Sequence, residues 1–241
     1  PLAMLNSNKE GITLDLKSEA GREAFLRLVD EADVVLENFL PGVMERLGLG
    51  GPALLQRNPR LVFASASGYG SSGPYKDMLA MDLTIQAMSG MINATGFPDQ
   101  PPVKAGPSIC DFLGGAHLYG AIVTALLERT QTGAGRICEV AMLDAAYLAL
   151  TSTIGLHFDD PDANPRTGSR HAGLAMAPYN VYPSRDGYVA IICVKEEHWQ
   201  AVARAMCREA LIGDANYATH EARSERMEEV DAMGGAWTAG L

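Results

Sequence analysis

Asp111 lies in a sequence context that could support covalent chemistry. It precedes a long apolar segment, and Gly114, Gly115 and Ala116 follow it within about one helical turn. Free backbone N–H groups and the helix dipole stabilise a carboxylate anion at a helix N-terminus, while small neighbours let a bulky ligand approach it. A carboxylate shielded in this way can act as a covalent nucleophile. The alternative is a purely structural cap, because Asp is a favoured N-cap residue.

A second group of polar and aromatic residues follows a short strand predicted over 33–37. Asn38 can form hydrogen bonds, Phe39 can stack on a flat ring, and Arg46 follows one to two helical turns later. Ligands of open parallel sheets lie at the carboxyl ends of the strands. The group therefore suits an adenine nucleotide, and an ordinary strand-to-helix loop with a surface arginine is the alternative.

Other function classes lack their signatures in this sequence. Its first predicted strand is not directly followed by G-x-G-x-x-G, and it has no G-x-x-x-x-G-K-[ST], G-x-S-x-G or H-E-x-x-H. These absences disfavour dinucleotide, P-loop, serine hydrolase and zinc protease sites, and we expect no metal site. A net charge of −10 disfavours binding to nucleic acid or to an anionic membrane. We expect no apolar run of membrane-spanning length, and four scattered cysteines point to a reducing cytoplasm.

The elements that must position these residues alternate between strands and helices. Strands are predicted over 11–16, 33–37, 61–67 and 136–142, and helices from Ser18, over 42–47, from Pro52 and over 82–91, 112–129 and 143–156. This order predicts a mostly parallel sheet covered by helices. The helix over 112–129 is expected to be buried, with His117 as a core histidine. A β-hairpin over 179–193 and helices over 196–208 and 221–233 follow.

Taken in order, these blocks resemble the family III CoA-transferases, which include formyl-CoA:oxalate and carnitine CoA-transferases. No single block is specific, but their order and spacing cover nearly the whole chain. The matching segments are Leu5–Lys9, Ile12–Lys17, Ala32–Gly42, Asn58–Val62, Ser67–Gly70, Gln86–Gly90, Thr95–Gly96, Pro101–Lys104, Asp111 with Gly115, Thr132–Arg136, Asp144–Ala145, Pro178–Tyr179 and Asp186–Gly187.

The resemblance implies an α/β fold with a Rossmann-like parallel-sheet large domain and a smaller α+β domain. We expect an incomplete large CoA-binding domain over 1–143, a helix and linker over 144–167, and an incomplete small domain over 168–241. In the family, two subunits interlock as a homodimer. Members are longer than this chain, so we expect a fragment that lacks both ends and does not turn over by itself.

The resemblance also implies the activity, which is transfer of CoA between an acyl-CoA and a small carboxylic acid. Asp111 would be the nucleophile, passing through a mixed anhydride and an aspartyl-CoA thioester. Coenzyme A and acyl-CoA would be substrates, with no tightly bound cofactor, no nucleic acid partner and no membrane partner. The implied CoA contacts are Leu14, Asp15, Leu16, Lys17, Asn38, Phe39, Leu40, Arg46, Met78, Leu79, Ala80 and Met81.

Two alternatives remain open at the level of sequence. The first is an α-methylacyl-CoA racemase, which needs a second acid or base besides the aspartate. Racemases of this family carry a histidine where Met81 stands, immediately before Asp82, so this sequence disfavours racemisation. The second alternative is a non-catalytic CoA-transferase remnant that folds and binds CoA weakly.

Overall fold

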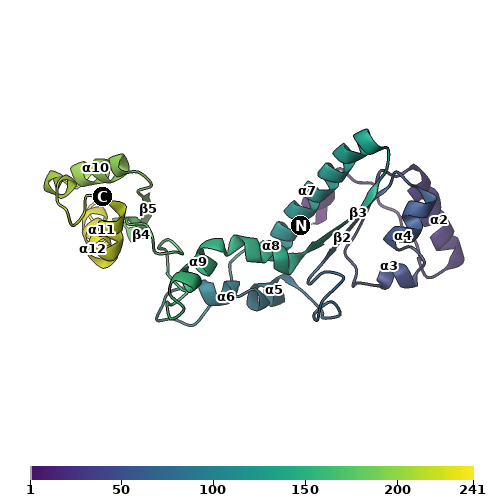
Figure 1. Cartoon of the computed structure of the whole chain (residues 1–241), viewed down its shortest axis with the longest axis horizontal. Helices are drawn as coiled ribbons and strands as arrows, with labels where there is room; N and C mark the ends of the chain where they lie inside the picture. Colours follow the sequence, from purple (N-terminus) through teal and green to yellow (C-terminus); the bar gives the residue numbers. More distant parts are fainter. Residues whose placement is uncertain (1) are drawn as a thin grey trace. The chain divides into compact units, whose positions relative to one another are not determined.

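The computed structural model describes residues 2–241, which form two compact units (Figure 1). One unit contains the chain up to residue 85 together with 108–146, and the other contains 86–107 and 147–241. The domain boundaries expected near 143 and 167 stay predictions.

Short helices and five strands alternate along the chain. In chain order the elements are α1 (Leu2–Asn6), α2 (Glu19–Glu31), β1 (Val34–Glu37), α3 (Val43–Arg46), α4 (Gly51–Arg57), β2 (Val62–Ser67), α5 (Asp82–Met88), α6 (Met91–Ala94), α7 (Ile109–Thr132), β3 (Arg136–Ala141), α8 (Met142–Ala149), α9 (Thr151–Asp159), β4 (Tyr179–Pro183), β5 (Tyr188–Ile192), α10 (Glu196–Ala205), the 3₁₀ helix η1 (Glu209–Ile212), α11 (His220–Glu225) and α12 (Met227–Thr238).

A parallel sheet in the order β1-β2-β3 is the centre of the first unit. The central strand β2 is paired on both sides, so that Val62 lies opposite both Val34 and Arg136. Val62, Phe63 and Ala64 are at most 4% exposed. A parallel strand covered on both faces needs apolar side chains on both, which is why its sequence reads as a continuous apolar run.

Helices cover the two faces of this sheet. Figure 1 shows α7 along one face, with α2, α3 and α4 on the other side. Val62 and Ala64 pack with Leu118 and Ala125 of α7. Side chains from the opposite face form a second cluster with α2, α3 and α4, namely Val29, Met44, Leu49, Leu54, Leu61 and Phe63. The predicted parallel sheet with helices packed against it is therefore present.

The strand predicted over residues 11–16 is wrong. This segment is irregular, and its Leu14 and Leu16 are only partly buried, Leu16 against the cluster that contains Val29. An alternating apolar pattern becomes a strand only where a neighbouring strand supplies hydrogen-bond partners. Among the described residues, β1 pairs with β2 alone, so residues 11–16 have no strand beside them.

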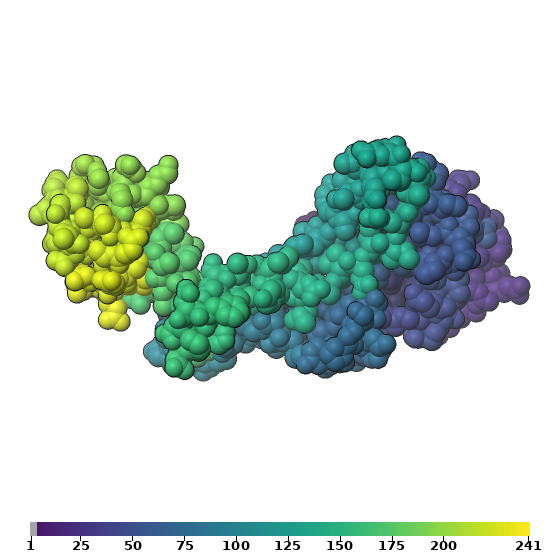
Figure 2. All heavy atoms as spheres, viewed as in Figure 1, coloured from purple at the N-terminus to yellow at the C-terminus, as the bar shows by residue number. Residues whose placement is uncertain are grey.

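The expectation that α7 is a buried helix is also wrong. Cys110, Gly114, Leu118 and Ala125 are buried, but large apolar side chains on its other side are exposed, including Phe112 at 63%, Tyr119 at 70% and Leu127 at 64%. His117 is exposed as well and contacts the Leu113 carbonyl oxygen through Nδ1 at 2.8 Å. The teal atoms of α7 form part of the surface in Figure 2. An apolar composition therefore does not show that a helix is buried on all sides.

The prediction from the sequence also underestimated how long the apolar segment of α7 is. By length and composition alone α7 could cross a membrane, contrary to the expectation that no segment reaches that length. A core helix of a water-soluble protein has the same length and composition. Since α7 packs along β2 and β3, this property does not assign it to a membrane.

Several helix boundaries follow local chemistry. Ser18 caps α2 as predicted, because its hydroxyl accepts a hydrogen bond from the Gly21 N–H at 3.0 Å. The helix predicted over 82–91 ends at Met88, and α6 begins after Gly90, whose φ of +84° interrupts the helical path. The helix predicted over 143–156 is likewise divided into α8 and α9 at Leu150.

The second unit contains the predicted hairpin of β4 and β5. The Ser184 N–H donates to the Gly187 carbonyl at 2.8 Å and closes its turn. Trp199 of α10 and Val230 of α12 are buried together with Cys193, which follows β5. The helix predicted over 221–233 is two helices, α11 and α12, which meet at Arg226.

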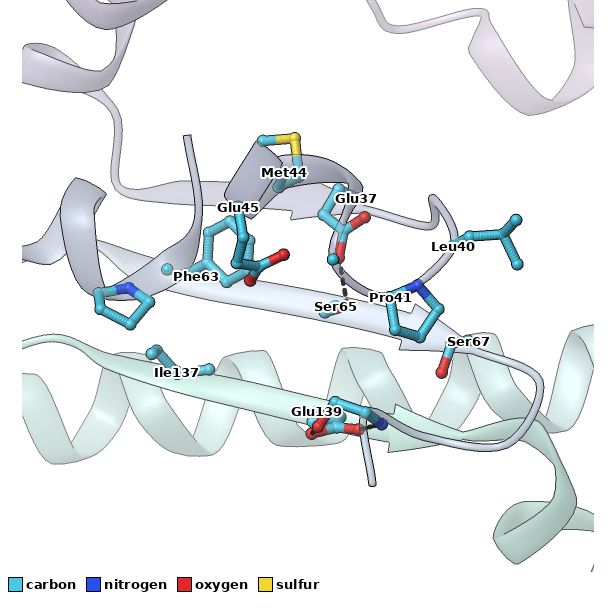
Figure 3. Close-up of a pocket in the computed structure, with 14 residues that line it drawn as sticks. Glu37, Leu40, Pro41, Met44, Glu45, Phe63, Ser65, Ser67, Ile137 and Glu139 are labelled. Atoms are coloured by element: carbon cyan, nitrogen blue, oxygen red, sulfur yellow. Dashed lines mark hydrogen bonds between the residues drawn. The ribbon is translucent and has the colours of Figure 1, made fainter. Parts of the chain in front are cut away.

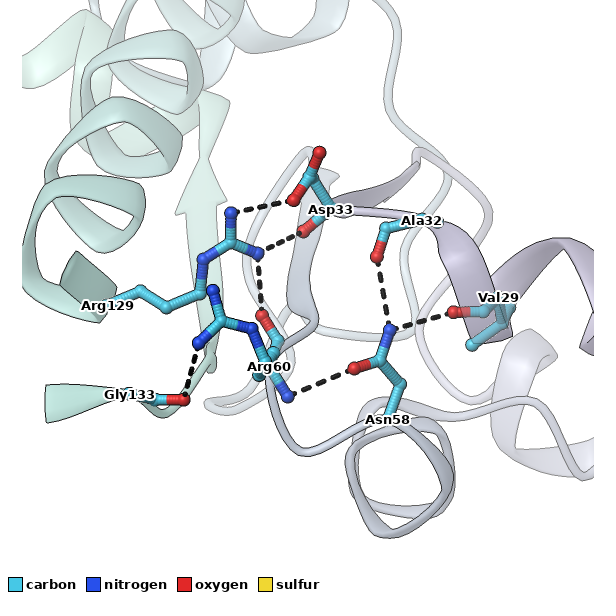
Figure 4. Close-up of polar contacts among 7 residues, drawn as sticks. All are labelled: Val29, Ala32, Asp33, Asn58, Arg60, Arg129 and Gly133. Atoms are coloured by element: carbon cyan, nitrogen blue, oxygen red, sulfur yellow. Dashed lines mark hydrogen bonds and ion pairs between the residues drawn. The ribbon is translucent and has the colours of Figure 1, made fainter.

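Arg129 ties the end of α7 to the amino-terminal side of the sheet (Figure 4). One guanidinium nitrogen donates to the Arg60 carbonyl at 2.8 Å, and another to Asp33 Oδ1 at 2.7 Å. The Arg129 side chain is only 12% exposed. Next to it, Asn58 Nδ2 donates to the carbonyls of Val29 and Ala32 and joins the end of α2 to the same corner.

We predict that Arg129→Gln lowers the free energy of unfolding by about 1–3 kcal/mol, because the substitution removes the hydrogen bonds by which a largely buried guanidinium joins Asp33 and the Arg60 carbonyl. The matched control is Arg136→Gln, which removes an exposed ion pair with Glu128 (2.8 Å) and should cost less than about 0.5 kcal/mol. Urea unfolding followed by circular dichroism measures both. Equal losses in the two variants would show that the Arg129 contacts carry no special stability.

Candidate functional site

Asp111 lies in the first turn of α7 but does not cap the helix. Ser108 occupies the N-cap position without a side-chain hydrogen bond. The cap comes from Asp82 at the start of α5, whose Oδ1 accepts the Cys110 N–H at 2.9 Å. Among the described residues, nothing forms a hydrogen bond or an ion pair with the Asp111 carboxylate. The structural-cap alternative for Asp111 is therefore wrong, and its carboxylate is available to a ligand.

The electrostatics at Asp111 also differ from the sequence expectation. The helix N-terminus was expected to favour the anion, but the pKa of Asp111 is raised, first by partial burial and then by the negative charge of Asp82. The same two causes, with a contribution from Asp111, raise the pKa of the Cys110 thiol to about 11. Cys110 is thus protonated at neutral pH, while Asp111 is a carboxylate with a strengthened affinity for protons.

A cavity of about 900 Å³, which we call the Asp111 cavity, opens beside this carboxylate. It lies against the α7 face of the sheet, and Gly115 leaves open space where any other residue would place a side chain. The cavity brings Asp111 together with most of the predicted CoA contacts from two other segments, namely Asn38, Phe39 and Leu40 after β1 and Met78, Leu79, Ala80 and Met81 before α5.

The remaining predicted contacts surround a second cavity, which we call the Lys17 cavity. It has a volume of about 440 Å³ and is lined by Leu14, Asp15, Leu16, Lys17, Phe39, Val43, Arg46 and Leu47. Phe39 lines both cavities, so the two adjoin at this residue. All the residues singled out from the sequence therefore line one cavity or the other, although their roles stay predictions.

Sequence reasoning missed several residues of the Asp111 cavity. Lys9, Tyr69 and Lys76 line it, and Asp82 acts on Asp111 without lining it. Lys76 is exposed, and none of the described residues forms an ion pair or a hydrogen bond with its amine. The sequence offered one signal, since Lys76 follows the glycine-rich stretch Gly68–Pro74 after β2. The position of Asp82 beside Cys110 had no such signal, because the two are 28 residues apart.

A smaller acidic pocket of about 110 Å³ lies on the opposite face of the sheet (Figure 3). Glu37, Glu45 and Glu139 line it, and Ser65 of β2 lies between Glu37 and Glu139 in the strand register. Ser65 donates a hydrogen bond to Glu37. The other oxygen of Glu37 accepts the Phe39 N–H at 2.8 Å. Glu37 therefore fixes the backbone of Phe39, the residue that lines both cavities.

Comparison with known proteins shows similarity along the whole chain. The model of CoA-transferase family III matches residues 1–241. The acetyl-CoA:oxalate CoA-transferase of Acetobacter aceti is 38% identical over 96% of this chain and 58% of its own length. The succinyl-CoA–D-citramalate CoA-transferase of Chloroflexus aurantiacus is 35% identical over 98% of this chain and 58% of its own length.

Solved structures have the same fold. A CAIB/BAIF family protein from Brucella suis matches with a TM-score of 0.77 and 33% identity, over 97% of this chain and 61% of its own. Rv3272 from Mycobacterium tuberculosis matches with a TM-score of 0.83 and 31% identity, over 97% of this chain and 61% of its own. The chain spans about three fifths of the length of these relatives.

We predict that Asp82→Asn lowers the pKa of Asp111, because it removes the neighbouring charge while an amide oxygen can still accept the Cys110 N–H. The shift is measured by ¹³C NMR titration of the labelled Asp111 carboxyl carbon. Asp186→Asn, in the turn between β4 and β5, is the charge-matched control and should leave that titration unchanged. An unchanged Asp111 titration in Asp82→Asn would contradict the assignment of Asp82 as a source of the shift.

Proposed function

Because this chain belongs to CoA-transferase family III, we propose that it carries the nucleophile and CoA-binding residues of an enzyme that moves CoA from an acyl-CoA to a carboxylic acid. One observation carries the proposal. The Asp111 carboxylate has no partner among the described residues and borders a cavity of about 900 Å³ with mostly apolar walls. Such a carboxylate is exposed to this cavity and can react covalently with a thioester that occupies it.

The proposed reaction passes CoA through Asp111. One Asp111 oxygen attacks the thioester carbonyl carbon of the acyl-CoA. The C–S bond breaks, CoA leaves as a thiolate, and the acyl group stays bonded to Asp111 as a mixed anhydride. The thiolate then attacks the Asp111 carbonyl carbon, which releases the donor acid as a carboxylate and forms an aspartyl-CoA thioester. The acceptor carboxylate attacks this thioester and expels the CoA thiolate. Attack of the thiolate on the acceptor carbonyl gives the new acyl-CoA and restores Asp111.

In this proposal CoA occupies both cavities. Lys17 and Arg46 border the Lys17 cavity and supply positive charge for phosphates in a chain of net charge −10. Phe39 offers an aromatic face between the two cavities. The thioester end then lies in the Asp111 cavity, where Gly115 leaves room next to the carboxylate.

Racemisation has less support than CoA transfer. Met81 lines the Asp111 cavity where a racemase would have a histidine. Among the described residues that line this cavity, none is a histidine, and His117 of α7 bonds instead with the Leu113 carbonyl. The described wall of the cavity therefore lacks the histidine that a racemase would use as its second acid or base.

The raised pKa of Asp111 has a consequence for activity. Attack requires the anion, so the rate should fall on acidification at a higher pH than for an ordinary aspartate. It also has a consequence for stability. A carboxyl whose pKa is higher in the folded state favours folding when protonated, and this contribution is lost as the pH rises through the folded-state pKa. Removing the charge at position 111 should therefore not destabilise the protein at neutral pH.

In an enzyme of the full length of its relatives, we predict that Asp111→Asn and Asp111→Ala reduce CoA transfer by about a thousandfold or more, because the nucleophile is gone. Asp111→Asn should unfold at a temperature at least as high as the original chain at pH 7. Hydroxylamine trapping during incubation with acyl-CoA, followed by mass spectrometry, should modify Asp111 in the intact protein. Modification at another acid would contradict the assignment. Deuterium uptake at the acyl α-carbon without any acceptor acid would support racemisation instead.

We further propose that the acceptor is a small dicarboxylic acid. One of these relatives is named for oxalate and the other for D-citramalate, and both of these acids are dicarboxylic. Lys9 and Lys76 border the cavity that contains Asp111, and a carboxylate not engaged in the reaction can pair with such an amine. The homodimer and the cytoplasmic location belong to the same proposal, by resemblance and cysteine content alone.

We predict that Lys76→Met lowers kcat/KM for dicarboxylic acceptors about tenfold, while monocarboxylic acceptors change less than about twofold. Kinetics with a panel of acids and one fixed acyl-CoA donor measure both. Lys195→Met, a lysine of the second unit, is the charge-matched control and should change neither class. An equal loss for both acceptor classes would instead place Lys76 on CoA.

A further inference from the structure

One wall of the Asp111 cavity is a loop without regular secondary structure. It runs from Gly68 at the end of β2 to Met81 before α5. Tyr69, Lys76 and the segment 78–81 of this loop line the cavity. Irregular loops are more mobile than the elements they join, so the shape of this wall depends on whatever holds the loop.

The base of the loop is closed by contacts near its two ends. The Gly68 carbonyl accepts the Leu143 N–H at 3.0 Å. Gly68 also lies so close to Ala80 that a Cβ added to Gly68 would be 2.0 Å from the Ala80 Cβ. The Gly70 N–H donates to the Ser67 hydroxyl oxygen at 2.9 Å. These contacts fix where the loop leaves and returns, but not its tip.

The tip is held by Glu139 of β3. The Ser71 backbone N–H and the Ser71 hydroxyl both donate to the Glu139 carboxylate, the hydroxyl at 2.7 Å. Gly70 has a φ of +83°, and a Cβ there would be 3.2 Å from Glu139 Oε1. Within the described chain, Glu139 is the one group beyond β2 that forms a hydrogen bond with residues 69–80.

Glu139 acts from the far side of the sheet. Its neighbours in β3, Cys138 and Val140, pack on the α7 face, so the Glu139 side chain points to the opposite face. There it lines the small acidic pocket of Figure 3 and does not line the Asp111 cavity. Glu139 cannot touch a ligand in the Asp111 cavity, and any influence on that cavity must pass through the loop.

We propose that Glu139 is a positioning residue, which holds Ser71 so that the loop from Gly68 to Met81 forms a defined wall of the Asp111 cavity. The proposal rests on the proposed function where it concerns CoA, since Met78–Met81 belong to the proposed CoA surface. A carboxylate suits the task because it accepts both hydrogen bonds of Ser71 at once, and charge-assisted hydrogen bonds are the stronger kind.

The test compares Glu139→Ala with Glu139→Gln, since glutamine can still accept from the Ser71 N–H and keep the side chain in place. Glu45→Ala is the matched control, because Glu45 borders the same small pocket but no described residue forms a hydrogen bond with its carboxylate. Hydrogen exchange of amides 69–78 reports on the loop directly. We expect it to be about tenfold or more faster in Glu139→Ala, close to the original in Glu139→Gln, and unchanged in Glu45→Ala.

CoA affinity, measured by calorimetry, is the second readout. We expect Glu139→Ala to weaken binding about tenfold with an unchanged melting temperature, and Glu139→Gln to restore it. Unchanged exchange in Glu139→Ala would overturn the proposal, and so would a loosened loop with unchanged CoA affinity. If the original protein does not bind CoA, the proposed function fails, whereas the exchange of residues 69–78 still decides whether Glu139 holds the loop.

Discussion

The hydrogen bond from the Cys110 N–H to Asp82 determines the chemistry available at the start of α7. A helix begins with backbone donors that need acceptors, and here the acceptor comes from α5 rather than from the residues of α7 itself. With Asp82 in this role, both Asp111 oxygens are free of partners among the described residues. The pKa of Asp111 is raised first by partial burial and then by the Asp82 charge, so the residue that caps α7 also contributes to the affinity of Asp111 for protons.

The two faces of the parallel sheet serve different purposes at its carboxyl end. On the α7 face, side chains such as Leu36 and Ala66 help to line the Asp111 cavity. On the other face, Glu37, Ser65 and Glu139 lie across three neighbouring strands. Glu37 accepts the Phe39 N–H after β1, and Glu139 accepts the Ser71 N–H after β2. The carboxylates behind the sheet thus support the loops that border the cavity in front of it. The alternation of side chains along a strand makes this division possible.

Charge is distributed unevenly around the two cavities. The chain has a net charge of −10, and yet Lys9, Lys17, Arg46 and Lys76 all border the Asp111 cavity or the Lys17 cavity. An anionic ligand such as CoA would meet local positive charge there in spite of the overall field. Behind the sheet, Glu37 accepts hydrogen bonds from Ser65 and Phe39, and Glu139 accepts them from Ser71.

The sequence by itself determined the elements whose signals are local. Ser18 sets the start of α2, the apolar run of β2 marks a strand buried on both faces, and the turn over 184–187 joins β4 to β5. The order of short blocks identified the family, and the residues it singled out all line one of two cavities. Only the tertiary structure decided which alternating segments pair with another strand and which apolar side chains become buried. Residues 11–16 alternate like a strand but have none beside them, and Phe112 and Tyr119 remain exposed on an apolar helix. The pKa of Asp111 is raised rather than lowered for the same reason, since its partial burial and its proximity to Asp82 both arise only after folding.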